Sequence, residues 1–332
     1  MEARLILKEQ RFEVHSHLAG IFKDEIAKDI SHGLTAPDKF IPSKYFYDAR
    51  GSELFNKICR LPEYYPTRTE MSILEQAAPA IMESFNYGDL VELGSGANWK
   101  IRMLLDAADE TSFSCLRYVP VDVSKAELLA ASEELLGIYP ELEVLGIVAD
   151  FTIHLNNIPN DRPRLIIFLG STIGNFDNKS RRAFLRHVAG TMNEGDRFLV
   201  GFDMLKPKET LEAAYNDSSG VTSKFNKNVL NVLNRELNAD FNPAHFEHVA
   251  FFNDEKERVE MHLQAKRRVE VNIDELGLVV QLDKDETIHT EICSKFSKSG
   301  VRKIIDEAGL LIKQLHSDSR QWFSLAELTL KN

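Results

Sequence analysis

Residues 89–100 form a stretch whose residue types suit the binding of a small ligand. A short apolar run is followed by Gly94, Ser95 and Gly96, and a helical pattern begins soon after them. Glycine permits a tight turn and lets the backbone come close to a ligand. The turn could equally be a plain connection between a strand and a helix, so the residues further along the chain must decide.

Two later positions carry carboxylates at the ends of apolar runs. Asp122 ends one run, and Asp150 ends the next and is followed by Phe151. A carboxylate at the end of the strand after a glycine turn can accept hydrogen bonds from ribose hydroxyls. Asp150 could then accept from an adenine amine while the Phe151 ring packs on the base. Each aspartate could instead cap a helix, but the turn and both strand ends together favour an adenosine ligand.

The spacing of the glycines narrows the kind of adenosine ligand. A dinucleotide site needs three glycines so that a helix N-terminus can approach the pyrophosphate. Here the turn is followed by Ala97, Asn98 and Trp99, and no further glycine occurs before Gly137. The cationic, phosphate-free S-adenosylmethionine therefore fits better than a nicotinamide or flavin dinucleotide, and a nicotinamide oxidoreductase is the least favoured reading.

An aromatic-rich segment before this stretch offers hydroxyl groups for a polar ligand. Tyr47 precedes a predicted turn, and Tyr64 and Tyr65 precede Pro66, which disfavours helix at the residue before it. Tyrosines on irregular backbone can present a hydroxyl to a ligand or simply fill a groove.

The start of the next helix has the pattern of a capping box. Thr67 is the expected N-cap, and Glu70 follows three positions later, where its carboxylate would accept from the backbone at the start of the helix.

Alternating strands and helices must position these groups. Strands are predicted at 89–93, 116–124, 142–151, 164–176 and 197–205, with helical segments between them. This alternation predicts an α/β fold with a mostly parallel, doubly wound sheet, and the ligand crevice lies at the carboxyl ends of such strands.

The alternation stops after residue 205, where helical and then antiparallel strand patterns indicate a second, α+β substrate domain. We expect residues 1–69 to form the N-terminal part of the substrate domain, 70–205 the Rossmann-like domain, 206–286 a lid or substrate-domain insertion, and 287–332 a return to the main sheet.

Composition favours a protein that binds small molecules. The 332 residues are 43% hydrophobic and carry a net charge of -11, and no basic run suits nucleic acid. The three cysteines lack CxxC spacing, so neither a disulfide framework nor a zinc cluster is predicted, and no metal site is expected. No segment has the length and apolarity of a membrane span. We expect a cytoplasmic monomer with a small-molecule substrate.

Several distinctive stretches resemble a known family over nearly the whole chain. They are FYDARGSELFNKICRLPEYYPTRTE, LVELGSG with the following Lys100, VPVDVS, ADF, LGSTIGNF, the region of Tyr215, and IHTEICSKF. The chain resembles the S-adenosylmethionine-dependent histidine Nα-methyltransferases of ergothioneine biosynthesis. The resemblance implies a class I, Rossmann-like methyltransferase fold with S-adenosyl-L-methionine as cofactor.

The resemblance also implies roles for individual residues. The cofactor contacts of the family fall on Gly94, Lys100, Asp122, Asp150 and Phe151. Its contacts to the amino-acid substrate fall on Tyr64, Asn175 and Tyr215, with Tyr47 near the reacting amine, so that Tyr47, Asn175 and Tyr215 are the implied catalytic group. Asn175 alone could also be an ordinary turn residue.

Recognition of the substrate side chain in the family falls on Met261, Glu291 and Cys293. Glu291 and Cys293 are two apart and face the same side of a strand, where Glu291 could accept from an imidazole N–H or be a plain surface carboxylate. The implied product is Nα,Nα,Nα-trimethylhistidine (hercynine), formed in the first step of ergothioneine biosynthesis.

Cys293 departs from the family, in which serine is common, and a thiol is a weaker hydrogen-bond partner than a hydroxyl. A methyltransferase for tryptophan, another amino acid or an indole amine is therefore the main alternative. A non-catalytic S-adenosylmethionine sensor is a rival from another class, against which the matching substrate residues argue.

Overall fold

The computed structural model describes residues 5–6, 11–18 and 22–331. By contacts, the chain divides into two compact units. The first comprises Met1–Leu18, Pro66–Leu205 and Lys295–Asn332, and the second comprises Ala19–Tyr65 and Lys206–Ser294. None of the described helices has both the length and the apolar character needed to cross a membrane.

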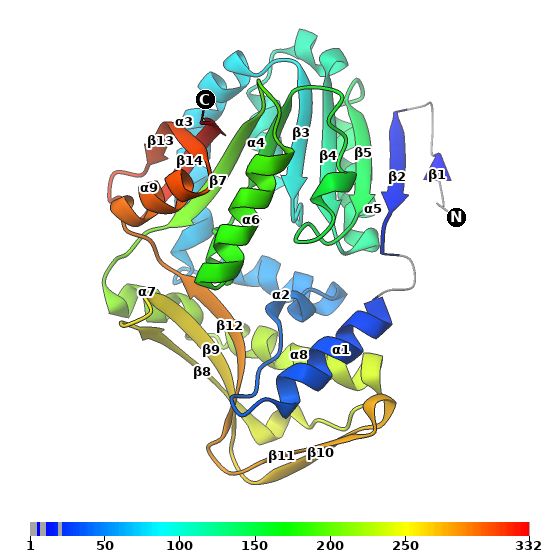
Figure 1. Cartoon of the computed structure of the whole chain (residues 1–332), viewed down its shortest axis with the longest axis vertical. Helices are drawn as coiled ribbons and strands as arrows, with labels where there is room; N and C mark the ends of the chain where they lie inside the picture. Colours follow the sequence, from blue (N-terminus) through cyan, green and yellow to red (C-terminus); the bar gives the residue numbers. More distant parts are fainter. Residues whose placement is uncertain (1–4, 7–10, 19–21, 332) are drawn as a thin grey trace. The chain divides into compact units, whose positions relative to one another are not determined.

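A nine-stranded sheet organises the first unit (Figure 1). Its order is β1-β2-β5-β4-β3-β6-β7-β14-β13, and the six strands from β2 to β7 pair in parallel. The strands are β1 Leu5–Ile6, β2 Phe12–Ser16, β3 Gly88–Leu93, β4 Leu116–Asp122, β5 Glu143–Val148, β6 Arg164–Phe168, β7 Arg197–Asp203, β13 Leu310–Ser317 and β14 Phe323–Leu330. The mostly parallel, doubly wound sheet expected from the alternation is confirmed.

Helices cover both faces of this sheet because its strands are apolar on both sides. One core cluster joins the sheet to α3, α4 and α5, and the other joins it to α6 and α9. Figure 1 shows α6 and α9 in front of the strands. The helices are α3 Tyr65–Ser84, α4 Trp99–Asp106, α5 Lys125–Ile138, α6 Asn178–Thr191 and α9 Lys298–Glu307.

The strand order reverses beside β3, which defines where a ligand can bind. From β3 the chain proceeds to β4 and β5 on one side, and afterwards to β6 and β7 on the other. Loops leaving neighbouring strands in opposite directions open a crevice at their carboxyl ends. The glycine turn follows β3 directly, at this switch point.

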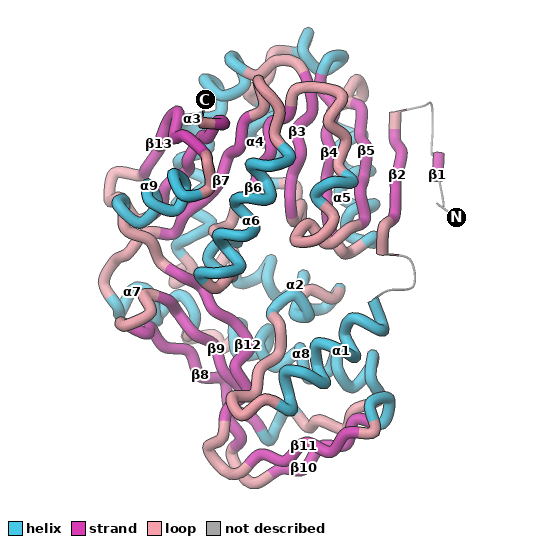
Figure 2. The backbone as a smooth tube through the Cα atoms, in the orientation of Figure 1, coloured by secondary structure: helices cyan, strands magenta, loops and turns pink. Residues whose placement is uncertain are grey.

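Among its described residues, the second unit combines four α-helices with two small antiparallel sheets (Figure 2). One sheet has the order β12-β9-β8, and the other is the hairpin β10-β11. The elements are α1 Phe22–Thr35, α2 Ala49–Ile58, α7 Lys208–Tyr215, α8 Val221–Leu237, β8 Phe246–Asn253, β9 Arg258–Ala265, β10 Val269–Ile273, β11 Leu278–Leu282 and β12 Thr287–Ser294.

The unit boundaries differ from the sequence-based ones at three places, one of which is the start of the second segment of the first unit at Pro66 instead of residue 70. Residues 1–69 were expected in the substrate domain, but β2 joins the main sheet, where Phe12 and Val14 are buried and the strand pairs with β5. The last boundary was expected after residue 286. It lies after Ser294, because all of β12 pairs with β9 in the second unit.

The start of α3 also differs from the prediction. The helix begins at Tyr65, with Pro66 in its first turn, where a missing N–H costs nothing. Thr67 is therefore inside the helix rather than at its N-cap, and the expected capping box is absent.

Candidate functional site

The glycine turn and Phe151 lie side by side in the first unit. Gly94 and Gly96 have φ values of 71° and 46°, which favour glycine. A Cβ atom on Gly94 would lie 3.5 Å from the Phe151 ring. The ring is held edge-on against Phe168 and Phe184, at centroid distances of 5.3 and 6.0 Å. The turn thus passes next to a half-buried aromatic surface.

The two predicted carboxylates lie at adjacent strand ends. Asp122 accepts from the backbone N–H of Ser124 at 2.9 Å and lies 3.4 Å from the Gly96 nitrogen. Burial raises the pKa of Asp122, and backbone hydrogen bonds oppose this shift. Asp150 is buried and uses one oxygen, Oδ1, to accept from the backbone and hydroxyl of Thr152, at 2.8 and 2.6 Å. The second oxygen of Asp150 has no hydrogen bond within the described part of the chain.

Lys100 is tied to a buried carboxylate that the sequence analysis assigned to a helix cap. Glu70 is fully buried, and its Oε2 lies 2.6 Å from Lys100 Nζ. Its two oxygens also accept from the backbone N–H of Gly170 at 2.7 and 3.0 Å. Glu70 therefore links α3, α4 and the loop after β6, while a fifth of the Lys100 side chain stays exposed.

The loop carrying Asn175 is fixed from both sides. Ser171 adopts a left-handed conformation with φ 55°, and its hydroxyl accepts from the Asp203 backbone at 2.9 Å. Arg181, on α6, donates to the carbonyls of Ile173 and Phe176 at 3.2 and 2.8 Å. Because these carbonyls flank Asn175, Arg181 determines the path of the backbone that presents it.

Glu92 is a second buried carboxylate beside the glycine turn. It accepts from the hydroxyl of Tyr118 at 2.5 Å, on the neighbouring strand. Burial raises the pKa of Glu92 to about 8, although Tyr118 and Lys100 act in the opposite direction. The group therefore holds a proton at neutral pH in the protein without ligand.

In the second unit, the predicted tyrosines form one aromatic cluster. The ring centroids of Tyr64 and Tyr215 are 6.3 Å apart, and Phe55 bridges Tyr64 and Tyr47 at 6.2 and 5.6 Å. Burial raises the pKa of Tyr64 well above its usual value, and Tyr215 adds to the shift. Tyr64 is thus a neutral phenol over the whole physiological pH range.

His248 positions the backbone at Tyr215. Its Nε2 donates to the Tyr215 carbonyl at 2.8 Å, and its Nδ1 accepts from the Asn226 amide at 2.9 Å. A carbonyl can only accept, so these two bonds require the Nε2–H tautomer. Burial lowers the pKa of His248, which keeps the ring neutral.

The residues implied in side-chain recognition share one face of the β12-β9 pair. Glu291 pairs with Met261 and Cys293 pairs with Val259, and directly opposite residues project on the same side of a sheet. Cys293 and Met261 are buried, whereas Glu291 is half-buried. A bulge between His289 and Glu291 shifts the register there. The expectation that Glu291 and Cys293 face the same side agrees with this register.

The structure therefore groups the site residues into two sets. The cofactor candidates and Asn175 belong to the first unit, while Met261, Glu291, Cys293 and the three tyrosines belong to the second. Sequence reasoning missed the supporting residues Glu70, Glu92, Arg181 and His248, since each acts through a partner that is distant in sequence. Glu70 and Arg181 are charged residues at helix positions where the pattern predicts an apolar residue, and this mismatch could have identified them.

Comparison with known proteins identifies a family and several relatives that the chain resembles. Residues 26–330 match the sequence profile of a family described as histidine-specific, SAM-dependent methyltransferases. A histidine N-alpha-methyltransferase from Mycolicibacterium smegmatis is 44% identical over 293 residues, covering 88% of this chain and 90% of the relative. One from Mycobacterium tuberculosis is 44% identical over 285 residues, covering 86% and 88%. An L-tryptophan methyltransferase from Psilocybe serbica is 27% identical over 333 residues, covering 91% and 92%.

Proposed function

The chain belongs to the histidine-specific, S-adenosylmethionine-dependent methyltransferase family, and we propose that it methylates the α-amino nitrogen of L-histidine. We propose that three methyl groups are added, giving Nα,Nα,Nα-trimethylhistidine as the first product of ergothioneine biosynthesis. The observation that carries the choice of histidine is the half-buried Glu291 carboxylate opposite Met261, on a strand face that also holds Cys293.

The first unit fits S-adenosylmethionine. A side chain at Gly94 would approach the Phe151 ring, so the glycine keeps open the space that an adenosyl group needs. Asp122 offers a carboxylate for the ribose hydroxyls, and the second oxygen of Asp150 can accept from the adenine amine. Ser95, Gly96 and Lys100 complete the proposed set. When bound, the cofactor supplies an electrophilic methyl group on a sulfonium centre.

The proposed substrate residues bind the two ends of an amino acid. Asn175 can accept from an amine and donate to a carboxylate, and hydroxyls such as those of Tyr64 and Tyr215 can bind the same kinds of group. Glu291 accepts from the imidazole N–H at the other end of the substrate. Binding energy from this remote contact helps to hold the amine in a reactive orientation.

In this proposal, the site does not need a strong base near the amine. Only a neutral amine has the lone pair that attacks the methyl group, so the site has to bind that form and orient it. Tyr64 is a protonated phenol because of its raised pKa, so it serves as a hydrogen-bond donor and not as a base. Tyr47 orients the amine, and its hydroxyl contacts can change as N–H groups are replaced by methyl groups.

Methyl transfer from labelled cofactor to each of the twenty amino acids tests the proposal. We expect turnover of L-histidine, with mass spectrometry showing a gain of three methyl groups. Turnover of another amino acid with none of histidine would refute the substrate assignment. A product that stops at one or two methyl groups would refute trimethylation alone.

A second candidate is an Nα-methyltransferase for tryptophan or another amino acid. Cys293 favours it, because a buried thiol binds an imidazole less strongly than a hydroxyl does. Glu291 argues against it, since covering a half-buried carboxylate with a hydrocarbon side chain is unfavourable. The amino-acid panel separates the two candidates. We further propose a cytoplasmic, monomeric enzyme.

A further inference from the structure

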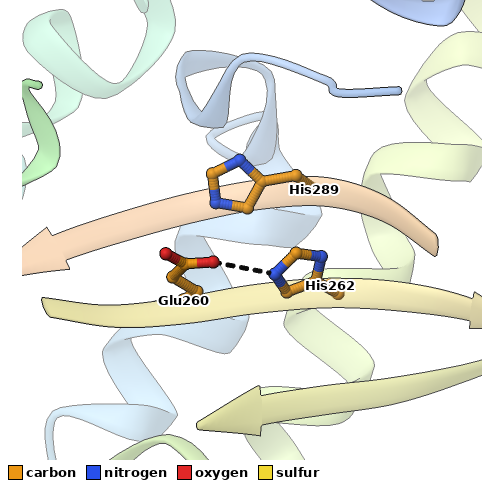
Figure 3. A group of neighbouring side chains, drawn as sticks. All are labelled: Glu260, His262 and His289. Atoms are coloured by element: carbon orange, nitrogen blue, oxygen red, sulfur yellow. Dashed lines mark hydrogen bonds and ion pairs between the residues drawn. The ribbon is translucent and has the colours of Figure 1, made fainter. Parts of the chain in front are cut away.

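Two histidines and a glutamate converge on the second unit's three-stranded sheet (Figure 3). Glu260 and His262 are two apart on β9, so they share a face, and His289 pairs directly with His262 across the two strands. One side-chain nitrogen or oxygen from each residue lies within 4.8 Å of those from the other two. This face is opposite the one that carries Met261 and Glu291, because the bulge after His289 reverses the side on which Glu291 projects.

We propose that Glu260, His262 and His289 bind a divalent transition-metal ion of the zinc class. Two imidazoles and one carboxylate are the protein ligands of open, tetrahedral zinc sites, and they leave a fourth position for water. Mg²⁺ and Ca²⁺ prefer sets of oxygen ligands, so this donor set disfavours them. No metal site was expected from the sequence, because the cysteines lack ligand spacing and these three ligands come from two separate strands.

The geometry is close to that of a bound ion. Zinc bonds of about 2.0–2.1 Å place the ligand atoms of a tetrahedral site roughly 3.4 Å apart. Glu260 Oε2 and His262 Nε2 are already 3.3 Å apart. The remaining ligand atoms need to approach by no more than about 1.4 Å to reach this spacing from 4.8 Å. Small side-chain rotations supply such a movement.

Neighbouring groups hold the carboxylate in the required orientation. Glu260 Oε1 accepts from Arg258 Nε at 2.8 Å and from the Asn253 amide at 3.1 Å, which leaves Oε2 facing the histidines. Such partners orient metal-binding carboxylates. The positive charge of Arg258 also weakens cation binding, so we expect moderate affinity.

Both histidine rings are held in place by neighbouring groups. The His262 ring stacks on Phe251 with an interplanar angle of 13°, and 14% of its side chain is exposed, which leaves a route for an ion. His289 donates from Nε2 to the Glu291 carbonyl at 3.1 Å. The backbone of His289 is fixed by Lys39 and Ile41, with both hydrogen bonds at 2.8 Å.

Calorimetry of the chelator-treated full chain with ZnCl₂ at pH 7.5 tests the site, with Co²⁺ absorption as a readout of coordination. We expect one ion per chain, a visible spectrum typical of tetrahedral Co²⁺, and an increase in melting temperature on zinc addition, because an ion that binds only the folded state stabilises it. The variants His289→Ala and Glu260→Gln should each bind zinc at least about tenfold more weakly.

His245→Ala is the matched control, since it removes a half-buried imidazole that is bonded to Arg267 and lies outside the cluster. The melting temperature of each variant without metal shows whether it folds, and Glu260→Gln retains the size of the side chain. Absence of zinc binding to the parent chain would overturn the proposal. So would equal affinities of the parent, His289→Ala and Glu260→Gln, because the ion would then bind at an adventitious place.

Discussion

Replacing Glu70 by glutamine should lower both the stability of the first unit and its affinity for the cofactor. The change removes the negative charge that lies 2.6 Å from Lys100 Nζ, in a side chain that is fully buried. The glutamine oxygen can still accept from the Gly170 backbone N–H, so this donor keeps its partner. The variant therefore tests the ion pair while keeping the hydrogen bond.

The expected magnitude follows from the burial of the pair. Breaking a buried ion pair by removing one partner costs about 3–5 kcal/mol. Lys100 is 20% exposed and can recover some hydration. We therefore expect a loss of about 2–3 kcal/mol in the free energy of unfolding, or roughly 5–10 °C in melting temperature. Without its partner, Lys100 is less well positioned, and a loss of about 1.4 kcal/mol would weaken cofactor binding about tenfold.

Differential scanning calorimetry and titration with S-adenosylhomocysteine measure the two effects. Glu75→Gln is the control, because Glu75 is an exposed glutamate on the same helix, α3. If Glu70→Gln matched this control in both melting temperature and cofactor affinity, the network of Glu70, Lys100 and Gly170 would not stabilise the site, and the reasoning would be wrong.

Three further predictions concern single side chains. His248→Phe should raise the KM for histidine about fivefold with cofactor affinity unchanged, because the Tyr215 carbonyl loses its donor; equal effects on both ligands would contradict this. Cys293→Ser should lower that KM by about threefold, since a hydroxyl is the stronger hydrogen-bond partner, and an unchanged or higher KM would exclude the contact. Glu92 binds its proton more tightly in the folded state, so its contribution to the free energy of unfolding should fall as pH rises from about 4.5 to about 8. Melting curves of Glu92→Gln should lack this pH-dependent loss of stability.

Much of the first unit could be predicted because its signals are local. Apolar runs that end in glycine or aspartate gave the strands β3, β4 and β5 and the edge at which Asp122 and Asp150 meet. Phe151 lies beside Gly94 although β4 separates β5 from β3, so this contact depends on the loops after the two strands and not on strand order alone.

The remaining features depend on contacts between distant segments. Glu70 was interpreted as a helix cap because only its own helix was visible in the sequence, whereas its partners are 30 and 100 positions away. The short strand β2 has too few residues to reveal that it pairs with β5. The bulge before Glu291 is likewise set by pairing, and it decides which side chains share a face.

The proposed function requires that the chain binds L-histidine through Glu291. Calorimetry with L-histidine in the presence of S-adenosylhomocysteine measures this binding, with Glu291→Gln and L-tryptophan as comparisons. We expect saturable binding of histidine that Glu291→Gln weakens at least about tenfold while its affinity for S-adenosylhomocysteine is unchanged. Tighter binding of tryptophan than of histidine, or histidine binding that is unaffected by Glu291→Gln, would contradict the account.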